Sequence, residues 1–234
     1  MKDLFGQAIL DYHNDNYTED IITSTSISEE DILPLPYLFR NYNEMPKLEQ
    51  KALDLAYGKV LDVGCGAGSH SLYLQEEKHL NVKAIDLSIG AIKVCKKRGV
   101  KKAKVKDILD ETKQYDTILL LMNGTGVFQE LILVTKYLSH LKSLLKPNGQ
   151  ILIDSSDMIY MYEDEDGGFW FDEITNYYGE LDYYVSYRGK KEEPFKMLYM
   201  DLELLNNACF AINLKCKLIL EGKHYDYLAK ITDM

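Results

Sequence analysis

The chain has 234 residues, 46% of them hydrophobic and 27% charged, with a formal net charge of −10. Such a composition fits one soluble domain with a substantial core, and the charge argues against a partner bound along its phosphate backbone. The longest apolar run, 118–122, is too short to span a membrane, and no apolar leader follows Met1. We expect a cytoplasmic protein with reduced thiols, because its four cysteines show neither C-x-x-C nor framework spacing: Cys65, Cys95, Cys209 and Cys216.

Strand and helix patterns alternate from residue 47 to the C-terminus. Short apolar runs ended by turns predict strands, and apolar residues three and four apart predict helices. The expected elements are helix 47–57, strand 59–63, helix 69–77, strand 81–86, helix 89–98, strand 101–106, strand 115–122, helix 129–145, strand 150–154, helix 201–211 and strands 214–220 and 225–231. This order predicts an α/β three-layer sandwich around a seven-stranded, mostly parallel sheet with one antiparallel strand.

Three glycines directly follow the first of these strands. The segment reads Asp62-Val63-Gly64-Cys65-Gly66-Ala67-Gly68, and glycine lets the backbone turn sharply and lets a ligand lie against bare main chain. A dinucleotide fingerprint needs Gly or Ala at the next position, where this chain has Ser69. Cys65 is interpreted as a small loop residue, because no paired base is apparent.

Carboxylates stand at the ends of three successive strands, at Asp62, Asp86 and Asp107. In open α/β sheets ligands bind beyond the carboxyl ends of the strands. Asp86 follows Gly66 by about 20 residues, the distance at which a carboxylate accepts hydrogen bonds from a ribose diol. The alternatives are that Asp86 only caps the next turn and that Asp107 is a solvated loop residue.

The glycine segment resembles motif I of the class I S-adenosylmethionine-dependent methyltransferases, in an uncharacterised bacterial branch. The resemblance spans 47–154 and the final strand pair. Leu145-Lys146-Pro147-Asn148-Gly149 resembles the family's Leu-Lys-Pro-Gly-Gly segment, and 120–126 resembles motif IV without the N-P-P-[YF] signature of base amino-methylation. The resemblance implies S-adenosylmethionine as cofactor.

The family's cofactor contacts carry over to matching positions of this sequence. The resemblance implies that Asp62 orients the loop or meets the cofactor's ammonium, that Asp86 holds the ribose, and that Asp107 accepts from the adenine amino group. Asn123 would face the methionine part and the transferable methyl. The expected cofactor-binding set is Arg40, Asp62, Gly64, Gly66, Gly68, Asp86, Leu87, Asp107, Ile108, Met122 and Asn123.

Specificity is expected from the segments outside the motifs. We divide the single domain into an N-terminal lid (1–46), a cofactor-binding core (47–155), an insertion after strand five (156–200) and a closing helix and strand pair (201–234). The insertion holds 12 of the 26 aromatic residues, which would form a substrate pocket, a protein interface or a satellite core. Arg40 in the lid is either a clamp for the methionine carboxylate or an ordinary surface arginine.

The expected reaction is in-line displacement, which needs alignment and exclusion of water rather than a fixed triad. We expect a small-molecule acceptor in an enclosed pocket beside Asn123, bounded by 1–46 and 156–200, with Asp154 or Asp157 at its polar wall. Asn123, Asp154 and Asp157 are the candidate catalytic residues. Alternatives are an RNA or protein methyltransferase and a non-catalytic cofactor-binding module.

Other charged residues suggest no second site. No metal is expected, because the five histidines lack ligand spacing and the acidic run 163–166 is typical of a solvated loop. The basic run 93–106 is interpreted as a solvated sheet edge rather than an RNA surface. The oligomeric state is not predicted.

Overall fold

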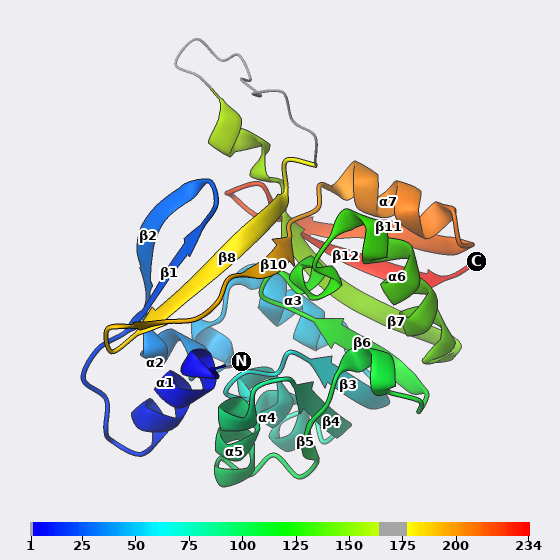
Figure 1. Ribbon diagram of the computed structural model, residues 1–234. Helices are drawn as coiled ribbons and strands as arrows, with labels where there is room; N and C mark the ends of the chain where they lie inside the picture. The colour runs from blue at the N-terminus through cyan, green and yellow to red at the C-terminus, as the bar shows by residue number, and fades with distance from the viewer. Residues whose placement is uncertain (1, 164–176) are drawn as a thin grey trace.

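The computed structural model describes residues 2–163 and 177–234. A seven-stranded sheet runs through its centre in the order β11-β12-β7-β6-β3-β4-β5 (Figure 1). All neighbouring pairs from β7 to β5 are parallel, whereas β12 is antiparallel to both β7 and β11. The predicted sheet is therefore confirmed, with the strands β3 (Lys59–Val63), β4 (Asn81–Asp86), β5 (Ala103–Val105), β6 (Tyr115–Leu120), β7 (Leu145–Ser156), β11 (Leu214–Glu221) and β12 (Asp226–Asp233).

Helices cover both faces of this sheet. Side chains of α6 and α7 pack on one face, and those of α3, α4 and α5 pack on the other. Among the described residues no helix is long and apolar enough to cross a membrane. The helices are α3 (Lys47–Leu55), α4 (Ser69–Glu76), α5 (Ile89–Lys97), α6 (Val134–Ser143) and α7 (Leu202–Phe210).

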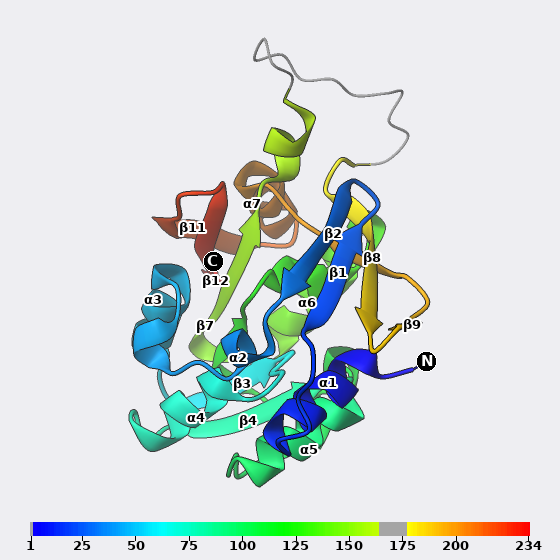
Figure 2. The ribbon, with the colours of Figure 1, turned by 90° about the vertical axis from the view of Figure 1, so that its left-hand side faces the viewer.

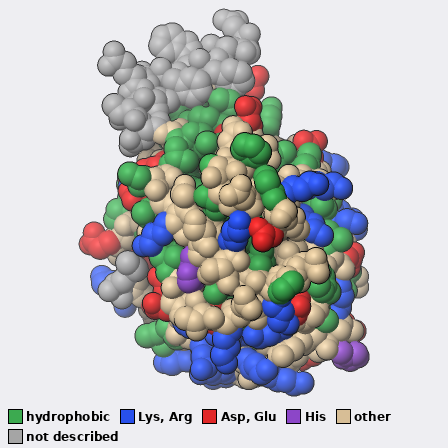
Figure 3. Space-filling model, turned by 90° about the vertical axis from the view of Figure 1, so that its right-hand side faces the viewer, with side chains coloured by type: hydrophobic (Ala, Val, Ile, Leu, Met, Phe, Trp, Pro, Cys, Tyr) green, Lys and Arg blue, Asp and Glu red, His purple; other side chains and the backbone are tan. Residues whose placement is uncertain are grey.

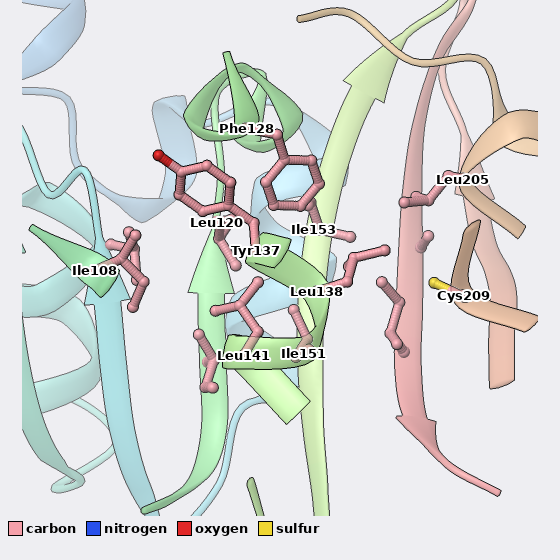
Figure 4. Packing of buried hydrophobic residues seen from close by; sticks show 14 of the residues in the cluster. Ile108, Leu120, Phe128, Tyr137, Leu138, Leu141, Ile151, Ile153, Leu205 and Cys209 are labelled. Atoms are coloured by element: carbon pink, nitrogen blue, oxygen red, sulfur yellow. The ribbon is translucent and has the colours of Figure 1, made fainter. Parts of the chain in front are cut away.

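The main core lies between α6, α7 and the central strands. Figure 4 shows Leu138 and Leu141 of α6 beside Ile151 and Ile153 of β7, and all four side chains are fully buried. Burying each of these side chains stabilises the fold by roughly 1.5–3 kcal/mol. This packing fixes the central strands, at whose ends the candidate site lies.

The helix predicted at 129–145 was too long at its N-terminal end. Gln129 has φ +66°, which a right-handed helix excludes, and a 3₁₀ turn at Leu131–Leu133 precedes α6. The apolar residues before 134 belong to this irregular connection. The spacing of apolar residues in the sequence does not distinguish such a connection from a turn of helix.

A second, antiparallel sheet joins the N-terminal segment to the insertion. Its order is β10-β8-β1-β2, with β9 paired to β8, and Figure 2 shows β1, β2 and β8 side by side. Ile22 of β1 pairs with Ser186 of β8, so the segments predicted as a lid and a separate insertion form one sheet. The elements are α1 (Leu4–His13), β1 (Ile21–Thr25), β2 (Ser28–Leu33), α2 (Leu35–Leu38), β8 (Glu180–Tyr187), β9 (Lys190–Lys191) and β10 (Phe195–Leu198).

Hydrogen bonds attach the second sheet, and the helix α1 that precedes it, to the seven-stranded sheet and its helices. Asp3, at the start of α1, accepts the backbone N–H of Gly90 in α5 at 2.8 Å. At the other end, Thr125 donates its hydroxyl to the Leu198 carbonyl of β10 at 2.9 Å. The second sheet is thereby fixed beside the turn that follows β6.

The described aromatic residues of the insertion mostly pack within the protein. Tyr183 and Tyr187 join the cluster between the second sheet and α1. Tyr177 donates its hydroxyl to Asp201 at 2.7 Å. These contacts are those of a satellite core, whereas Phe169, Trp170 and Phe171 lie outside the described residues.

Candidate functional site

The glycine segment presents bare backbone at the end of β3. Gly64 and Gly66 have φ of +69° and +51°, and a Cβ built on either would meet no atom within 4 Å. At Gly68 a Cβ would lie 2.9 Å from the sulfur of Cys95 in α5. The loop therefore packs against the protein at Gly68 and faces open space at Gly64 and Gly66, where a ligand has room to contact the main chain.

Asp62 lies beneath this loop rather than in the open space. Its side chain is 2% exposed and accepts the Ser71 hydroxyl of α4 at 2.6 Å. Burial raises the pKa of the Asp62 carboxyl. This geometry corresponds to orienting the loop, whereas the alternative contact with a cofactor ammonium is not supported for a carboxylate enclosed in this way.

Asp86 connects the glycine loop to the turn after β4. One carboxylate oxygen accepts the N–H of Gly66 at 2.9 Å, and the other accepts the N–H of Ser88 at 2.8 Å. Burial raises the pKa of Asp86 even though these two N–H groups favour its charged form. Asp86 therefore does cap the turn, as one interpretation held, and it also stands beside the open backbone. The next side chain, Leu87, is 67% exposed.

Asp107 and Ile108 follow β5 on the same side of the sheet. Asp107 is half-buried and accepts the N–H of Leu109 at 2.9 Å, which makes it the N-cap of a 3₁₀ turn. The Ile108 side chain is buried in the main core, and its carbonyl contacts the ring nitrogen of His140 at 2.9 Å. Both residues thus hold the turn that borders the ends of β4 and β5.

The segment after β6 adopts an uncommon backbone conformation. Met122 and Asn123 have φ of +67° and +61° in succession, a left-handed conformation that side chains other than glycine rarely adopt. Asp154 of β7 accepts the N–H groups of Met122 and Gly124 at 2.9 and 2.8 Å. Asp154 therefore stabilises the turn, and its burial raises its pKa to about 6.

The side chain of Asn123 is held on one side only. Its amide oxygen accepts a hydrogen bond from the Ser155 hydroxyl at 3.2 Å and lies 3.3 Å from the Thr125 hydroxyl oxygen. Its amide nitrogen is buried and has no hydrogen-bond partner within the described part of the chain. The amide orientation is therefore set by two neighbouring hydroxyl groups.

Three buried charged residues meet beside this turn: Arg40, Glu49 and His70. Arg40 pairs with one oxygen of Glu49 in α3, and the other oxygen lies 2.6 Å from Nε2 of His70 in α4. Burial alone would raise the pKa of Glu49, but its contacts with His70 and Arg40 lower it. Burial would lower the pKa of His70, yet Glu49 and Asp62 raise it.

This network corrects the expected role of Arg40. Its Nη atoms bind Glu49 and the Tyr37 carbonyl, so the guanidinium is not free to form a two-pronged clamp on a ligand carboxylate. The sequence analysis missed Glu49 and His70. A signal for Glu49 existed, because a charged residue stands beside Leu48 on the apolar face of a predicted helix.

A cavity of about 290 Å³ lies beside Asn123, where a pocket was predicted, but it is open to solvent on one side rather than enclosed. Tyr37 and Pro46 from the N-terminal segment line it, as predicted, but Ser156 is the only described lining residue from the predicted boundary 156–200. The remaining walls come from α3, the ends of β6 and β7, and the start of β12. The described lining residues are Tyr37, Pro46, Leu48, Glu49, Met122, Asn123, Asp154, Ser155, Ser156 and Asp226.

Asp157 is not among these lining residues, and neither is any other described residue of 157–200. Asp157 accepts the N–H of Ile159 at 2.9 Å and the hydroxyl of Tyr178 at 2.7 Å. Asp154 therefore lines the cavity, as one of the two expectations held. Asp157 does not line it, because its carboxylate holds the turn after β7 instead.

Two further expectations concern metal-ligating side chains and the basic run 93–106. Within residues 2–163 and 177–234 no three His, Cys, Asp or Glu side chains gather as a metal site would require. The lysines of 93–106 lie on α5, on β5 and in the turns beside them, at the edge of the sheet opposite β11, and most are exposed. Figure 3 shows Lys and Arg side chains gathered at the lower end of the molecule, the end where α5 and β5 lie in Figure 1.

The chain is similar to methyltransferases of known sequence and structure. A family model described as a methyltransferase domain matches residues 56–225. The crystal structure of an S-adenosylmethionine-dependent methyltransferase from Bacteroides fragilis, in complex with S-adenosyl-L-homocysteine, is 42% identical with a TM-score of 0.92. The similarity covers 99% of this chain and 95% of that one.

Two further relatives are more distant. An S-adenosylmethionine-dependent methyltransferase from Clostridium acetobutylicum shares the fold, at 16% identity over 79% of this chain and 87% of that one, with a TM-score of 0.55. Phosphoethanolamine N-methyltransferase 1 from Triticum aestivum is 32% identical over 118 residues, which is 43% of this chain. The match spans only about a fifth (21%) of the wheat protein's length.

Proposed function

Because the chain belongs to the class I S-adenosylmethionine-dependent methyltransferases and its cofactor is S-adenosylmethionine, we propose that it methylates a small-molecule acceptor by in-line displacement. The cavity beside Met122 and Asn123 is the observation that carries this proposal. It lies at the carboxyl end of β6, next to the strand whose glycine loop faces open space, so one ligand can lie across the loop and another in the cavity.

The residues around the glycine loop fit the cofactor. In this proposal the main chain at Gly64 and Gly66 contacts the methionine part, and the Asp86 carboxylate accepts from the ribose hydroxyls. The exposed side chain of Leu87 covers the adenine ring, and Asp107 and the backbone of Ile108 bind its edge. Two observations support this fit. The space next to Gly64 and Gly66 is free, and the apolar side chain of Leu87 is exposed to water unless a ligand covers it.

The bound cofactor supplies a methyl group already activated by a positively charged sulfur. The protein's own residues then have three tasks, which are alignment, exclusion of water and removal of a proton where the acceptor carries one. The left-handed turn at Met122 and Asn123, fixed by Asp154, positions backbone groups between the cofactor and the cavity. Asn123 and Asp154 line that cavity and remain the candidate catalytic residues.

The size of the cavity favours a small acceptor. A volume of about 290 Å³ is close to the lower end of small-molecule sites, and of a larger acceptor it would admit only a single base or side chain. The wheat relative is consistent with this, because its name gives a small molecule as acceptor. An RNA or protein acceptor and a non-catalytic binding module are the alternatives.

Transfer of a tritium-labelled methyl group distinguishes these alternatives. The purified protein is incubated with methyl-tritiated S-adenosylmethionine and a cell extract, and the extract is then separated into small-molecule, RNA and protein fractions. We expect label in the small-molecule fraction. Label confined to RNA or protein would overturn the proposal, and cofactor binding without label in any fraction would indicate a binding module.

A further inference from the structure

The carboxylates that line the cavity are not all balanced by positive charge. Glu49 is paired with Arg40 and contacts His70. Asp154 is only 8% exposed, and neither it nor Asp226 forms an ion pair with any described residue. No Lys, Arg or His is among the described lining residues. Among the described residues, Asp154 accepts the backbone N–H groups of Met122 and Gly124, and Asp226 accepts that of His224, but neither carboxylate has a cationic side chain as partner.

We propose that the acceptor is a protonated amine without a phosphate group, that Asp154 and Asp226 bind its ammonium, and that its nitrogen receives the methyl group. This inference rests on the proposed function, since it places the acceptor in the same cavity. It also separates this chain from the wheat relative, whose named acceptor carries a phosphate.

Charge complementarity is the main physical argument. A charge pair a few ångströms apart is several times stronger in a partly buried site than in water, so an ammonium in this cavity is favoured and a phosphate beside two carboxylates is repelled. Arg40 and His70 offset this negative charge only in part. Both contact Glu49 directly, and His70 also faces Asp62, although its charge lowers the pKa of Asp154 against the effect of burial.

The remaining lining suits the rest of such a molecule. Tyr37, Leu48 and Met122 offer apolar surface for its carbon atoms, and the serine hydroxyls offer neutral hydrogen-bonding groups. The guanidinium of Arg40 already covers the Tyr37 ring at 3.8 Å from its centroid. The ammonium is therefore placed at the carboxylates rather than on that face of the ring.

The transfer requires the amine to lose a proton first. One N–H proton passes from the ammonium to the Asp154 carboxylate, which frees the nitrogen lone pair. That lone pair forms a bond to the methyl carbon while the carbon–sulfur bond breaks and its electron pair stays on sulfur. The products are a methylated ammonium and neutral S-adenosylhomocysteine, and Asp154 returns its proton to water. Burial of Asp154 supports this role, because it raises the pKa of the carboxyl to about 6.

Three probes of nearly the same shape test the charge preference. Choline carries a permanent positive charge, 3,3-dimethylbutan-1-ol is its neutral isostere, and phosphocholine adds a phosphate. Their affinities for the protein loaded with S-adenosylhomocysteine are measured by calorimetry. We expect choline to bind at least roughly tenfold tighter than either of the other two. Choline binding no tighter than the neutral isostere, or undetectable choline binding, would overturn the inference, and so would a preference for phosphocholine.

A matched pair of variants on β12 localises the effect. Asp226→Asn should weaken choline binding by about fivefold or more and leave the neutral isostere unchanged, because only a charge is removed. Asp233→Asn makes the same change at the exposed far end of β12 and should leave both affinities unchanged. Equal choline affinities in the two folded variants would show that Asp226 does not bind the ammonium. The comparison of probes in the wild-type protein holds even if a variant fails to fold.

Activity measurements separate this inference from the proposed function. Dimethylethanolamine and its phosphate are offered as acceptors with tritiated S-adenosylmethionine, and we expect more label in the amine without phosphate. If small molecules other than amines are methylated instead, the inference fails and the proposed function stands. If label enters only RNA or protein, both fail.

Discussion

The guanidinium of Arg40 and the carboxylate of Glu49 form an ion pair with only 5% of each side chain exposed. Arg40 follows α2 in the N-terminal segment, and Glu49 lies in α3, so the pair joins the segment before the methyltransferase motifs to the core. His70 of α4 contacts the second oxygen of Glu49. The segment after α2 and the helices α3 and α4 are therefore fixed to one another beside the cavity next to Asn123.

Removing one partner of this pair should be costly. Arg40→Met leaves the buried Glu49 carboxylate with His70 alone, and breaking a buried ion pair typically costs about 3–5 kcal/mol. The free energy of unfolding, measured in urea, should fall by an amount in this range. Lys196→Met is the control, because its pair with Asp182 is about 40% exposed and contributes at most about 1 kcal/mol. Equal losses in the two variants would contradict this account of the network.

The open side of the glycine loop gives a sharper test of cofactor placement. Gly64→Ala puts a methyl group into the space assigned to the cofactor and should weaken S-adenosylhomocysteine binding by roughly tenfold or more. Gly189→Ala is the matched control, because Gly189 has φ +64° and an equally open Cβ position in the turn after β8. Both changes carry a similar left-handed backbone cost of about 1–2 kcal/mol.

Calorimetry with the two glycine variants decides the matter. Their unfolding free energies should be similar, and only the Gly64→Ala protein should lose affinity. If both variants bind S-adenosylhomocysteine equally well, the cofactor does not lie against Gly64.

Asp86 has two possible tasks, and a ligand pair tells them apart. If its carboxylate accepts from the ribose, Asp86→Ala should lower S-adenosylhomocysteine affinity about tenfold or more, since hydrogen bonds to charged groups contribute about 1.5–3 kcal/mol. The wild-type protein should also bind the 2′-deoxy analogue more weakly than S-adenosylhomocysteine, and the variant should not distinguish the two. Suppose that the variant is folded by circular dichroism and still binds S-adenosylhomocysteine more tightly than the 2′-deoxy analogue. Asp86 would then not contact the ribose, and its role would be limited to the hydrogen bonds with Gly66 and Ser88.

The pH dependence of stability should reveal the buried Glu111. Burial alone would raise its pKa, but contacts with Lys83 and Lys106 lower it to about 2, from the ordinary value of 4.5. A carboxyl whose pKa is lowered by folding stabilises the protein above the unfolded value and loses this contribution as the pH falls. The difference in unfolding free energy between wild type and Glu111→Gln should therefore be full at pH 7 and shrink between about pH 4.5 and pH 2. A difference that stays constant over this range would contradict the assignment.

The central sheet was predictable because each of its strands carries a local signal. The segments at 59–63, 81–86 and 115–122 are short and rich in β-branched or apolar residues, and the structure places strands at 59–63, 81–86 and 115–120. The pairing of the N-terminal segment with the insertion in the second sheet was missed for the opposite reason. The pairing of Ile22 with Ser186 joins residues far apart in the chain, and the partly exposed strands have no continuous apolar pattern.

The candidate site divides in the same way. The strand-end carboxylates Asp62 and Asp86 follow from motif and position, since parallel strands bring their carboxyl ends together. Glu49 and Asp226 reach the cavity from α3 and from the antiparallel strand β12, so their place depends on how the layers pack. Arg40 was assigned to a ligand because its buried partner, Glu49, was not apparent in the sequence.

A crystal structure with S-adenosylhomocysteine bound tests the central claim most directly. We expect the homocysteine part to lie against Gly64 and Gly66, with the sulfur beside Met122 and Asn123 and facing the cavity lined by Asp154 and Asp226. That arrangement would place a transferred methyl group within reach of a small acceptor. A sulfur that faces a broad open surface, or a cavity separated from the sulfur by protein, would contradict the account.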